Sequence, residues 1–220
     1  GSFATGWPQA CGQFLSASHF CQDITLKIAF VITRSDAVGG AQIHVRDIST
    51  ALRKAGHEAV VLAGGSGPWL EQLQERNIPV ITLRHMQRSI SPINEIRALF
   101  ELRRHLRALA PDLVSTHTAK AGVLGRIAAA SLRLPVMFTA HGWTFTDGIS
   151  RLKATVWRTI EQMVGRLAGR IVTVSEFDRR LALQARIAAP ERIIAIHNGM
   201  PDVVPELIAD AGSEAPKLVM

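Results

Sequence analysis

Five short apolar runs of this chain each lead to a small polar or glycine-containing cluster. The clusters are Gly39-Gly40, His117-Thr118, His141-Gly142, Ser175-Glu176 and Asn198-Gly199. In an open parallel sheet, ligands bind in the crevice at the carboxyl ends of the strands, where such loops meet. The pattern therefore predicts an α/β fold with a binding site along one edge of a parallel sheet.

Strand-like and helix-like patterns alternate along most of the chain. Apolar runs typical of buried strands fall at 27–33, 58–63, 79–83, 113–116, 136–139, 171–174 and 192–197. Helical patterns fall at about 42–54, 69–76, 92–109, 119–132 and 152–167. Because this alternation is typical of a parallel sheet covered by helices, we predict a Rossmann-like three-layer α/β/α domain with a mostly parallel sheet of about seven strands.

Local signals mark the ends and the apolar faces of several helices. Ser91 is an N-cap residue followed by Pro92 at the first helical position. Ser175 lies three residues before Asp178, which resembles a capping box with Asp in place of Glu. Two apolar stripes at helical spacing are expected to face the core. They are Ile93, Ile96, Leu99, Phe100, Leu106 and Leu109 in one helix, and Leu152, Val156, Ile160, Met163, Val164 and Leu167 in another.

The chain divides into three segments. Residues 1–26 lack helix or strand periodicity and are expected to be an N-terminal tail, whose Gly1-Ser2 is typical of a cloning remnant. Residues 27–200 carry the predicted domain. Residues 201–220 combine prolines with a short apolar end at Lys217–Met220. We expect them to be an interdomain linker and the start of a C-terminal donor-binding domain that lies beyond this sequence.

Neither the cysteines nor the hydropathy pattern indicates an extracellular or membrane-spanning protein. Cys11 and Cys21 both lie in the tail, so no disulfide framework or zinc site is indicated. No apolar run approaches the roughly 18 to 20 residues that cross a bilayer. The first residues also lack the basic and apolar regions of a secretory signal. We expect a cytoplasmic protein.

The formal net charge of +7 at pH 7 indicates anionic partners. Nucleic acid is disfavoured, because aromatic residues make up only 5% of the chain and its basic residues are spread over several helices. Arg97, Arg103, Arg104 and Arg107 lie away from the apolar stripe of the helix at 92–109. They form either an ordinary solvated face or a contact with an anionic membrane, which would place the protein at the inner face of the membrane.

Several residues at the strand ends have side chains or backbone suited to a polar ligand. Gly39 and Gly40 allow backbone N–H groups to approach an anion at the start of a helix. His141 directly follows a strand, so its ring is expected to point into the crevice and to hydrogen-bond to sugar hydroxyls or phosphate. His117, Thr118 and Lys120 sit at the neighbouring strand end, although Thr118 is also suited to cap the next helix.

Other classes of site lack their motifs. The sequence contains neither G-x-G-x-x-G nor a Walker A loop, which disfavours NAD binding and ATP hydrolysis. The absence of H-E-x-x-H, Cys-x-x-Cys and D-x-D disfavours a dedicated metal site. The absence of G-x-S-x-G disfavours α/β-hydrolase chemistry.

The chain from Lys27 to Pro201 resembles the N-terminal domain of family 4 glycosyltransferases, retaining enzymes of the GT-B fold. The matching segments, in order, are 36–45 (DAVGGAQIHV), 52–58 (LRKAGHE), 116–122 (THTAKAG), 139–142 (TAHG), 174–176 (VSE) and 198–200 (NGM). The stretch 120–126 (KAGVLGR) looks most like members that build bacterial surface polysaccharides on lipid carriers.

The resemblance implies roles for individual residues. His141 would be the catalytic residue beside the transferred sugar, and Gly39 and Gly40 would lie against the donor diphosphate. Asp36, His117, Thr118 and Lys120 would bind the acceptor, and Gly142, Ser175 and Asn198 would line the rest of the cleft. The resemblance implies no metal or other cofactor, and a UDP- or GDP-linked sugar as co-substrate.

We therefore expect the N-terminal half of a glycosyltransferase that transfers a sugar, with retention, from a nucleotide sugar to a glycan or lipid-linked acceptor. The resemblance implies a C-terminal domain in cis that binds the donor, so this half alone is expected to be inactive. Two alternatives remain open: a non-catalytic carbohydrate- or phosphate-binding module, and a sugar-nucleotide epimerase of GT-B type.

Overall fold

A computed structural model describes residues 24–89, 91–146 and 148–199 of the chain. They form a seven-stranded sheet in the order β3-β2-β1-β4-β5-β6-β7, in which every neighbouring pair is parallel. The strands are β1 (Lys27–Ile32), β2 (Glu58–Gly64), β3 (Val80–Leu83), β4 (Leu113–His117), β5 (Val136–Ala140), β6 (Arg170–Thr173) and β7 (Ile193–Ala195). This confirms the predicted fold class. The linker expected at 201–220 and most of the tail lie outside the described residues.

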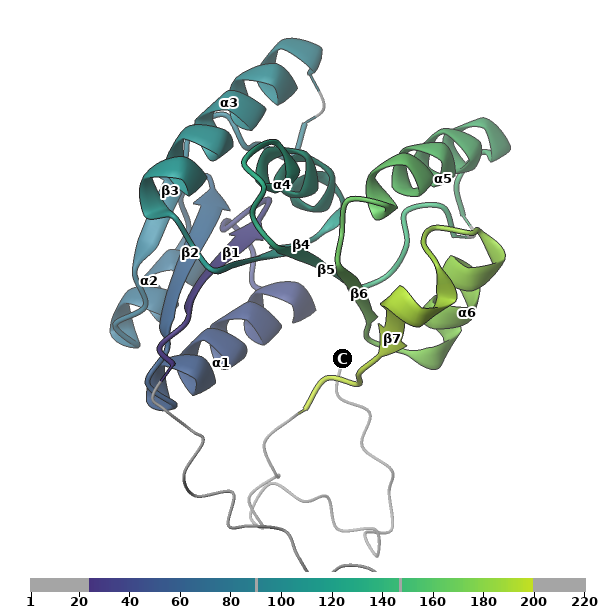
Figure 1. Ribbon diagram of the computed structural model, residues 1–220. Coiled ribbons are helices and arrows are strands. Elements are labelled where there is room, and N and C mark those ends of the chain that lie inside the picture. Colours follow the sequence, from purple (N-terminus) through teal and green to yellow (C-terminus); the bar gives the residue numbers. More distant parts are fainter. Residues whose placement is uncertain (1–23, 90, 147, 200–220) are drawn as a thin grey trace, which may run out of the picture.

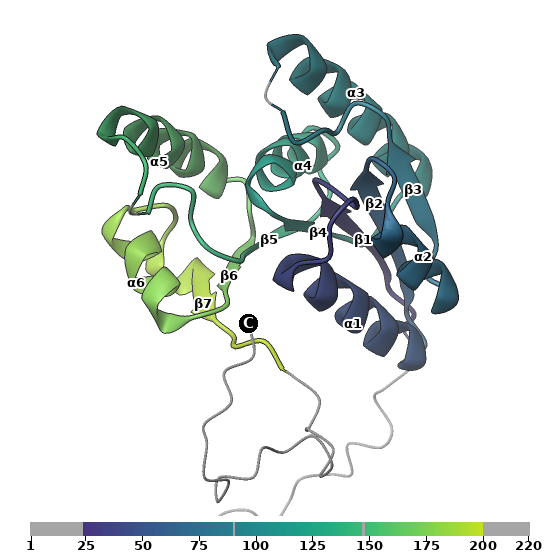
Figure 2. The same ribbon diagram turned by 180° about the vertical axis from the view of Figure 1, so that it is seen from behind.

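Helices cover the sheet on both faces (Figures 1 and 2). They are α1 (Gly40–Lys54), α2 (Pro68–Glu75), α3 (Pro92–Leu109), α4 (Ala119–Ser131), α5 (Arg151–Gly165) and α6 (Glu176–Gln184). Helices α1 and α2 lie against one face of β1 and β2, and α3 and α4 lie against the other face. Both views show α4 between α3 and α5.

The central strand β1 is buried on both faces, which explains its uninterrupted apolar sequence. Successive side chains of a strand point to opposite faces. Phe30 and Ile32 therefore join the cluster under α1 and α2, whereas Ala29 and Val31 join the cluster under α3 and α4. The expected strand 27–33 is thus a core element of both layers.

Two predicted boundaries differ from the structure. The strand expected at 192–197 is only β7, at Ile193–Ala195, because Pro190–Arg192 forms a short 3₁₀ turn that delivers the chain to the sheet edge. Helix α1 begins at Gly40 instead of residue 42. The expected cap of α6 is present: the Ser175 hydroxyl accepts a hydrogen bond from the Asp178 backbone N–H at 3.0 Å.

The two apolar stripes assigned to the core are partly exposed, which corrects the prediction. On α3, Ile93, Ile96 and Phe100 face solvent, with Phe100 65% exposed. On α5, Leu152 is 76% exposed. Periodicity locates a stripe but does not identify the face that packs. On α5 that face is set by Gly165, where a Cβ would lie 2.2 Å from the Ile187 carbonyl oxygen.

A buried ion pair joins α4 to α5. The Arg126 Nη2 atom lies 2.7 Å from a carboxylate oxygen of Glu161, and both side chains are almost fully buried. Arg126 also donates to the Gly122 carbonyl oxygen at 2.7 Å and stacks over the Phe138 ring. Burial raises the pKa of Glu161 and lowers that of Arg126, although each charge opposes the shift of the other. The pair holds α5 by mutual dependence, because each charge requires its partner.

We predict that Glu161→Leu lowers the free energy of unfolding of this chain by about 3–5 kcal/mol, since it leaves the Arg126 charge buried and unpaired. Chemical denaturation followed by circular dichroism measures this change. The double variant Arg126→Leu/Glu161→Leu should recover at least half of the loss. Glu58→Ala, which breaks an exposed pair with Lys27, is the control and should cost at most about 1 kcal/mol. Equal costs for Glu161→Leu and Glu58→Ala would contradict this account.

Candidate functional site

The candidate site lies where the strand order of the sheet reverses. The chain moves from β1 outward to β3, then returns through α3 to β4 on the other side of β1. The loops after β1 and β4 therefore diverge and leave a crevice at the carboxyl ends of these strands, the usual ligand position in doubly wound sheets. The residues predicted from the strand ends cluster around this crevice.

Two threonines close the base of the crevice. The Thr33 and Thr118 hydroxyl oxygens are 2.7 Å apart, and the Thr33 backbone N–H also donates to the Thr118 hydroxyl at 3.3 Å. The Ala121 backbone N–H donates to the Thr33 hydroxyl at 3.1 Å. Thr118 occupies the N-cap position of α4 with a φ of 67°, but its hydroxyl joins β1 to β4 instead of capping the helix. The predicted acceptor contact of Thr118 stays a prediction.

Three histidines meet above this base. His44 projects from α1, His117 ends β4 and His141 follows β5, and their ring centroids are 5.0 to 5.6 Å apart. His117 Nδ1 lies 3.1 Å from His141 Nε2, and His117 Nε2 lies 2.9 Å from the Ser115 hydroxyl. We call His44, His117 and His141 the histidine cluster. It places two of the predicted site residues in contact.

The histidine cluster is held in the neutral state. Burial drives the pKa of His117 well below its usual value, and the neighbouring His141 and His44 add to the effect. Burial, followed by the charge of His44, lowers the pKa of His141 to about 4. Burial also lowers the pKa of His44, although a hydrogen bond with Asn198 opposes that shift. At neutral pH these rings therefore act as hydrogen-bonding groups and as nitrogen ligands, not as cations.

The loop between β1 and α1 presents a free helix N-terminus. Gln42 closes this loop, since its side chain accepts from the Gly39 N–H at 3.3 Å and donates to the Arg34 carbonyl oxygen at 3.2 Å. The first turn of α1 contains no acidic residue, and a Cβ placed at Gly40 would meet no atom within 4 Å. The positive end of the helix dipole is thus open to an anion.

Asp36, predicted to bind the acceptor, is paired with Arg34 in this loop. Arg34 Nε and Nη2 donate to the two carboxylate oxygens of Asp36 at 2.6 and 2.8 Å. These hydrogen bonds hold the pKa of Asp36 below its usual value. The carboxylate is exposed and charged beside the crevice, where it can accept hydrogen bonds from hydroxyl groups.

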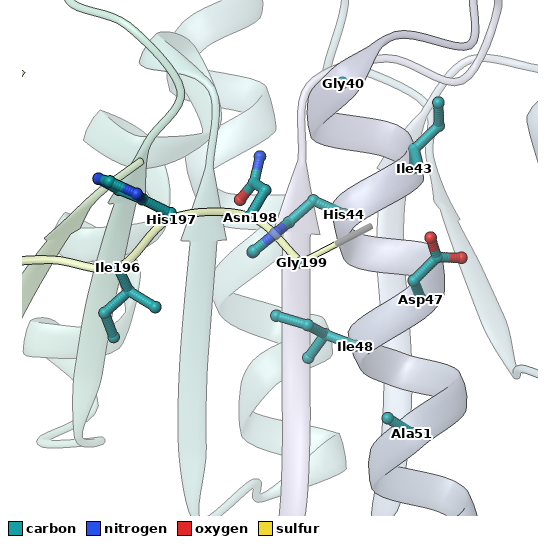
Figure 3. A pocket seen from close by; sticks show the side chains of 10 residues that line it. All are labelled: Gly40, Ile43, His44, Asp47, Ile48, Ala51, Ile196, His197, Asn198 and Gly199. Carbon is teal, nitrogen blue, oxygen red and sulfur yellow. The ribbon is translucent and has the colours of Figure 1, made fainter. Parts of the chain in front are cut away.

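A groove runs from the N-terminal half of α1 to the segment after β7 (Figure 3). Its lining includes His44 and Ile48 from α1 and Ile196 and Asn198 from the segment after β7. Figure 3 shows His44 projecting from α1 toward this segment. The groove therefore brings Asn198, a predicted cleft residue, to the histidine cluster.

The structure uses the remaining predicted residues differently. Lys120 Nζ donates to the carbonyl oxygens of Gln87 and Ser89 at 2.6 and 2.5 Å and pairs with Glu95 at 2.6 Å. Its three protons thus hold the loop before α3 against α4, and its acceptor role stays a prediction. Gly142 adopts a φ of 123°, a left-handed conformation that turns the chain directly after His141. Ser175 caps α6.

Sequence reasoning missed two members of the site. His44 lies inside an ordinary amphipathic helix, and only its position one turn after Gly40 could have placed it near the strand ends. Ser115 lies inside the buried strand β4, and its alternation with His117 puts both side chains on one face.

Solved structures share this fold. HepE from Anabaena, in complex with UDP and glucose, matches with a TM-score of 0.63 and 23% identity over 80% of this chain and 45% of that chain. A glycosyltransferase from Rickettsia africae matches with a TM-score of 0.63 and 18% identity over 83% of this chain and 47% of that one. A UDP-N-acetylglucosamine 2-epimerase from Listeria monocytogenes, described as putative in its own right, matches with a TM-score of 0.58 and 16% identity, covering 77% of this chain and 44% of that one.

Sequence comparison gives a more specific relation. The chain is 28% identical over 136 residues to the UDP-Gal:alpha-D-GlcNAc-diphosphoundecaprenol alpha-1,3-galactosyltransferase of Escherichia coli. That match covers 61% of this chain and 35% of the relative, so the chain spans well under half of the proteins it resembles. The model of the glycosyl transferase 4-like domain matches residues 39–199, from the N-terminus of α1 to the segment after β7. The chain therefore belongs to the glycosyl transferase 4-like domain family.

Proposed function

We propose that this chain is the acceptor-side domain of a retaining glycosyltransferase. The protein would transfer a sugar from a UDP- or GDP-linked donor to a hydroxyl of a glycan or lipid-linked acceptor. The observation that carries the proposal is the position of His141, which lies in the crevice with His117 and close to the open N-terminus of α1. HepE, which shares the fold, is solved with UDP and glucose, and the Escherichia coli relative is named for a UDP-Gal donor.

The geometry suits a division of labour between the helix N-terminus and the histidine cluster. The free N–H groups of α1 would bind the donor diphosphate, whose negative charge increases as the glycosidic bond breaks. Neutral His141 would donate or accept a hydrogen bond with a hydroxyl of the transferred sugar. His117 would fix the orientation of His141 through their 3.1 Å contact, and Asp36 would receive the acceptor.

We propose that a second domain in cis completes the donor site. The chain spans 45% of HepE and 35% of the galactosyltransferase that it resembles. The crevice is formed by one sheet edge, so a nucleotide sugar bound there would remain open to water on its other side. A second wall would exclude water and supply further groups for the developing charge.

Replacing His141 tests this proposal in the full-length protein. We expect His141→Ala to reduce kcat/KM for sugar transfer by about 10- to 100-fold, equivalent to the loss of roughly 1.4–2.7 kcal/mol of transition-state binding. Mass spectrometry with an isotopically labelled nucleotide sugar and an acceptor measures transfer. His57→Ala is the control, because His57 precedes β2 at the opposite edge of the sheet.

Two outcomes would contradict the proposal. Wild-type turnover in His141→Ala would remove the assigned role of that residue. Conversion of the nucleotide sugar to an isomer without consumption of acceptor would identify an epimerase, the activity named for one of the fold neighbours.

We further propose that α3 and α5 contact an anionic membrane. Exposed apolar side chains on these helices are Ile93, Ile96, Phe100, Leu152, Val156 and Met163. Exposed cations beside them are Arg97, Arg104, Arg107, Arg151, Lys153 and Arg158. An apolar stripe flanked by cations is typical of a helix that lies in the interface of an anionic bilayer.

The position of the two helices supports this second proposal. Both lie on the same face of the sheet, on either side of α4 (Figures 1 and 2). Among the described residues, no helix has the length and hydropathy of a membrane span. The acceptor named for the Escherichia coli relative is a diphosphoundecaprenol lipid. Contact with the bilayer surface would bring the crevice close to such a substrate.

We predict that this chain cosediments with vesicles containing phosphatidylglycerol at low salt and that binding weakens as ionic strength rises. Phe100→Asp/Leu152→Asp should abolish the cosedimentation, because each change puts a negative charge in the apolar contact. Ile196→Asp is the matched control, since Ile196 is also exposed but lies in the groove beside α1. Equal binding of wild type to uncharged vesicles, or equal losses in both variants, would sink this proposal.

A further inference from the structure

The histidine cluster has the donor arrangement of a transition-metal site. One ring nitrogen from each of His44, His117 and His141 lies within 4.8 Å of the other two. The shortest of these separations, between His117 Nδ1 and His141 Nε2, is 3.1 Å. The three residues come from α1, β4 and the loop after β5, so no local sequence motif announces them.

The distances match the size of such a site. A tetrahedral metal bound at about 2.0–2.1 Å holds its nitrogen ligands roughly 3.4 Å apart. The contact between His117 and His141 is already near this value. His44 is only half-buried on the surface of α1, so its ring can rotate to close the remaining gap.

A neighbouring hydroxyl prepares the least mobile ligand. His117 is buried, stacks on Phe30, and places Nε2 2.9 Å from the Ser115 hydroxyl. When Ser115 accepts the Nε2 proton, the lone pair of His117 lies on Nδ1, which faces the other two rings. Metal-binding histidines commonly use their second ring nitrogen in this way.

The ligand set indicates the class of metal. Three imidazoles suit Zn²⁺ and its neighbours Co²⁺, Ni²⁺ and Cu²⁺. Mg²⁺ and Ca²⁺ require oxygen ligands, which the histidine cluster does not offer. Three protein ligands also leave a fourth position for water or substrate, and here that position faces the crevice.

We propose that the histidine cluster binds one divalent transition-metal ion of the zinc type and that the bound ion blocks the sugar site. Binding uses the lone pairs of His44, His117 Nδ1 and His141 Nε2. A proton on His141 Nε2 moves to Nδ1 of the same ring, so the ring stays neutral and no redox change occurs. The competition with sugar rests on the proposed role of His141, whereas metal binding does not.

Zinc binding to the metal-free chain tests the site directly. His19, Cys11 and Cys21 are first replaced, because thiols and imidazole of the tail would also bind zinc. Isothermal titration with Zn²⁺ should then give a single site per chain, and Co²⁺ should produce the intense visible absorption of a tetrahedral complex. No affinity tag containing histidine remains on the protein.

Variants locate the bound ion. His44→Gln and His141→Gln should each weaken binding by more than about tenfold, and Ser115→Ala should weaken it by about 10- to 100-fold. His57→Gln and His85→Gln, outside the cluster, should bind as the parent does. His44→Gln changes a half-exposed helix residue, so it keeps the test valid if a change at buried His117 unfolds the chain. Absence of binding, or affinity unchanged in His44→Gln, would overturn the site.

Competition is measured separately in the full-length enzyme. Zn²⁺ should raise the apparent KM for the nucleotide sugar, and a chelator should restore it. Zinc binding without this rise would overturn the competition while leaving the site. Failure of sugar transfer itself would count against the proposed function, and the titration of the isolated chain would still decide whether the metal site exists.

Discussion

The arrangement of the site depends on the hydrogen bond between the Thr33 and Thr118 hydroxyls. It links the ends of β1 and β4 across the point where the strand order reverses. Because the Ala121 N–H also donates to Thr33, the first turn of α4 is fixed to the end of β1. Without this link the two loops would be free to separate at the position where the sheet offers its ligand crevice. The positive φ of Thr118 is the local strain that accompanies the link.

On this base the fold keeps three imidazoles neutral at close range. Each added charge would be poorly solvated and would repel its neighbours, so burial and proximity act in the same direction on His117 and His141. A neutral ring can bind a sugar hydroxyl or a soft cation through the same lone pair. Sugar recognition and metal binding are therefore two uses of one chemical arrangement, and they exclude each other at His141.

The sheet was predictable because a buried parallel strand must be apolar on both faces, and β1 and β2 show this directly in their sequences. The strand-end rule also placed His117 and His141 correctly beside one crevice. The rotation of α3 and α5 was not predictable, because periodicity does not say which side of a stripe meets the sheet. Lys120 was assigned to a ligand, but its position beside Glu95 depends on the approach of α3 to α4, which involves residues 25 apart. His44 was missed for the same reason.

The central claim is that a nucleotide sugar binds at the N-terminus of α1 and reaches His141. A crystal structure of the full-length protein with a UDP- or GDP-linked sugar tests it most directly. The account predicts diphosphate oxygens within hydrogen-bonding distance of the backbone N–H groups at Gly40, and a sugar hydroxyl within such distance of His141. A diphosphate bound away from α1, with the histidine cluster free of sugar, would contradict it.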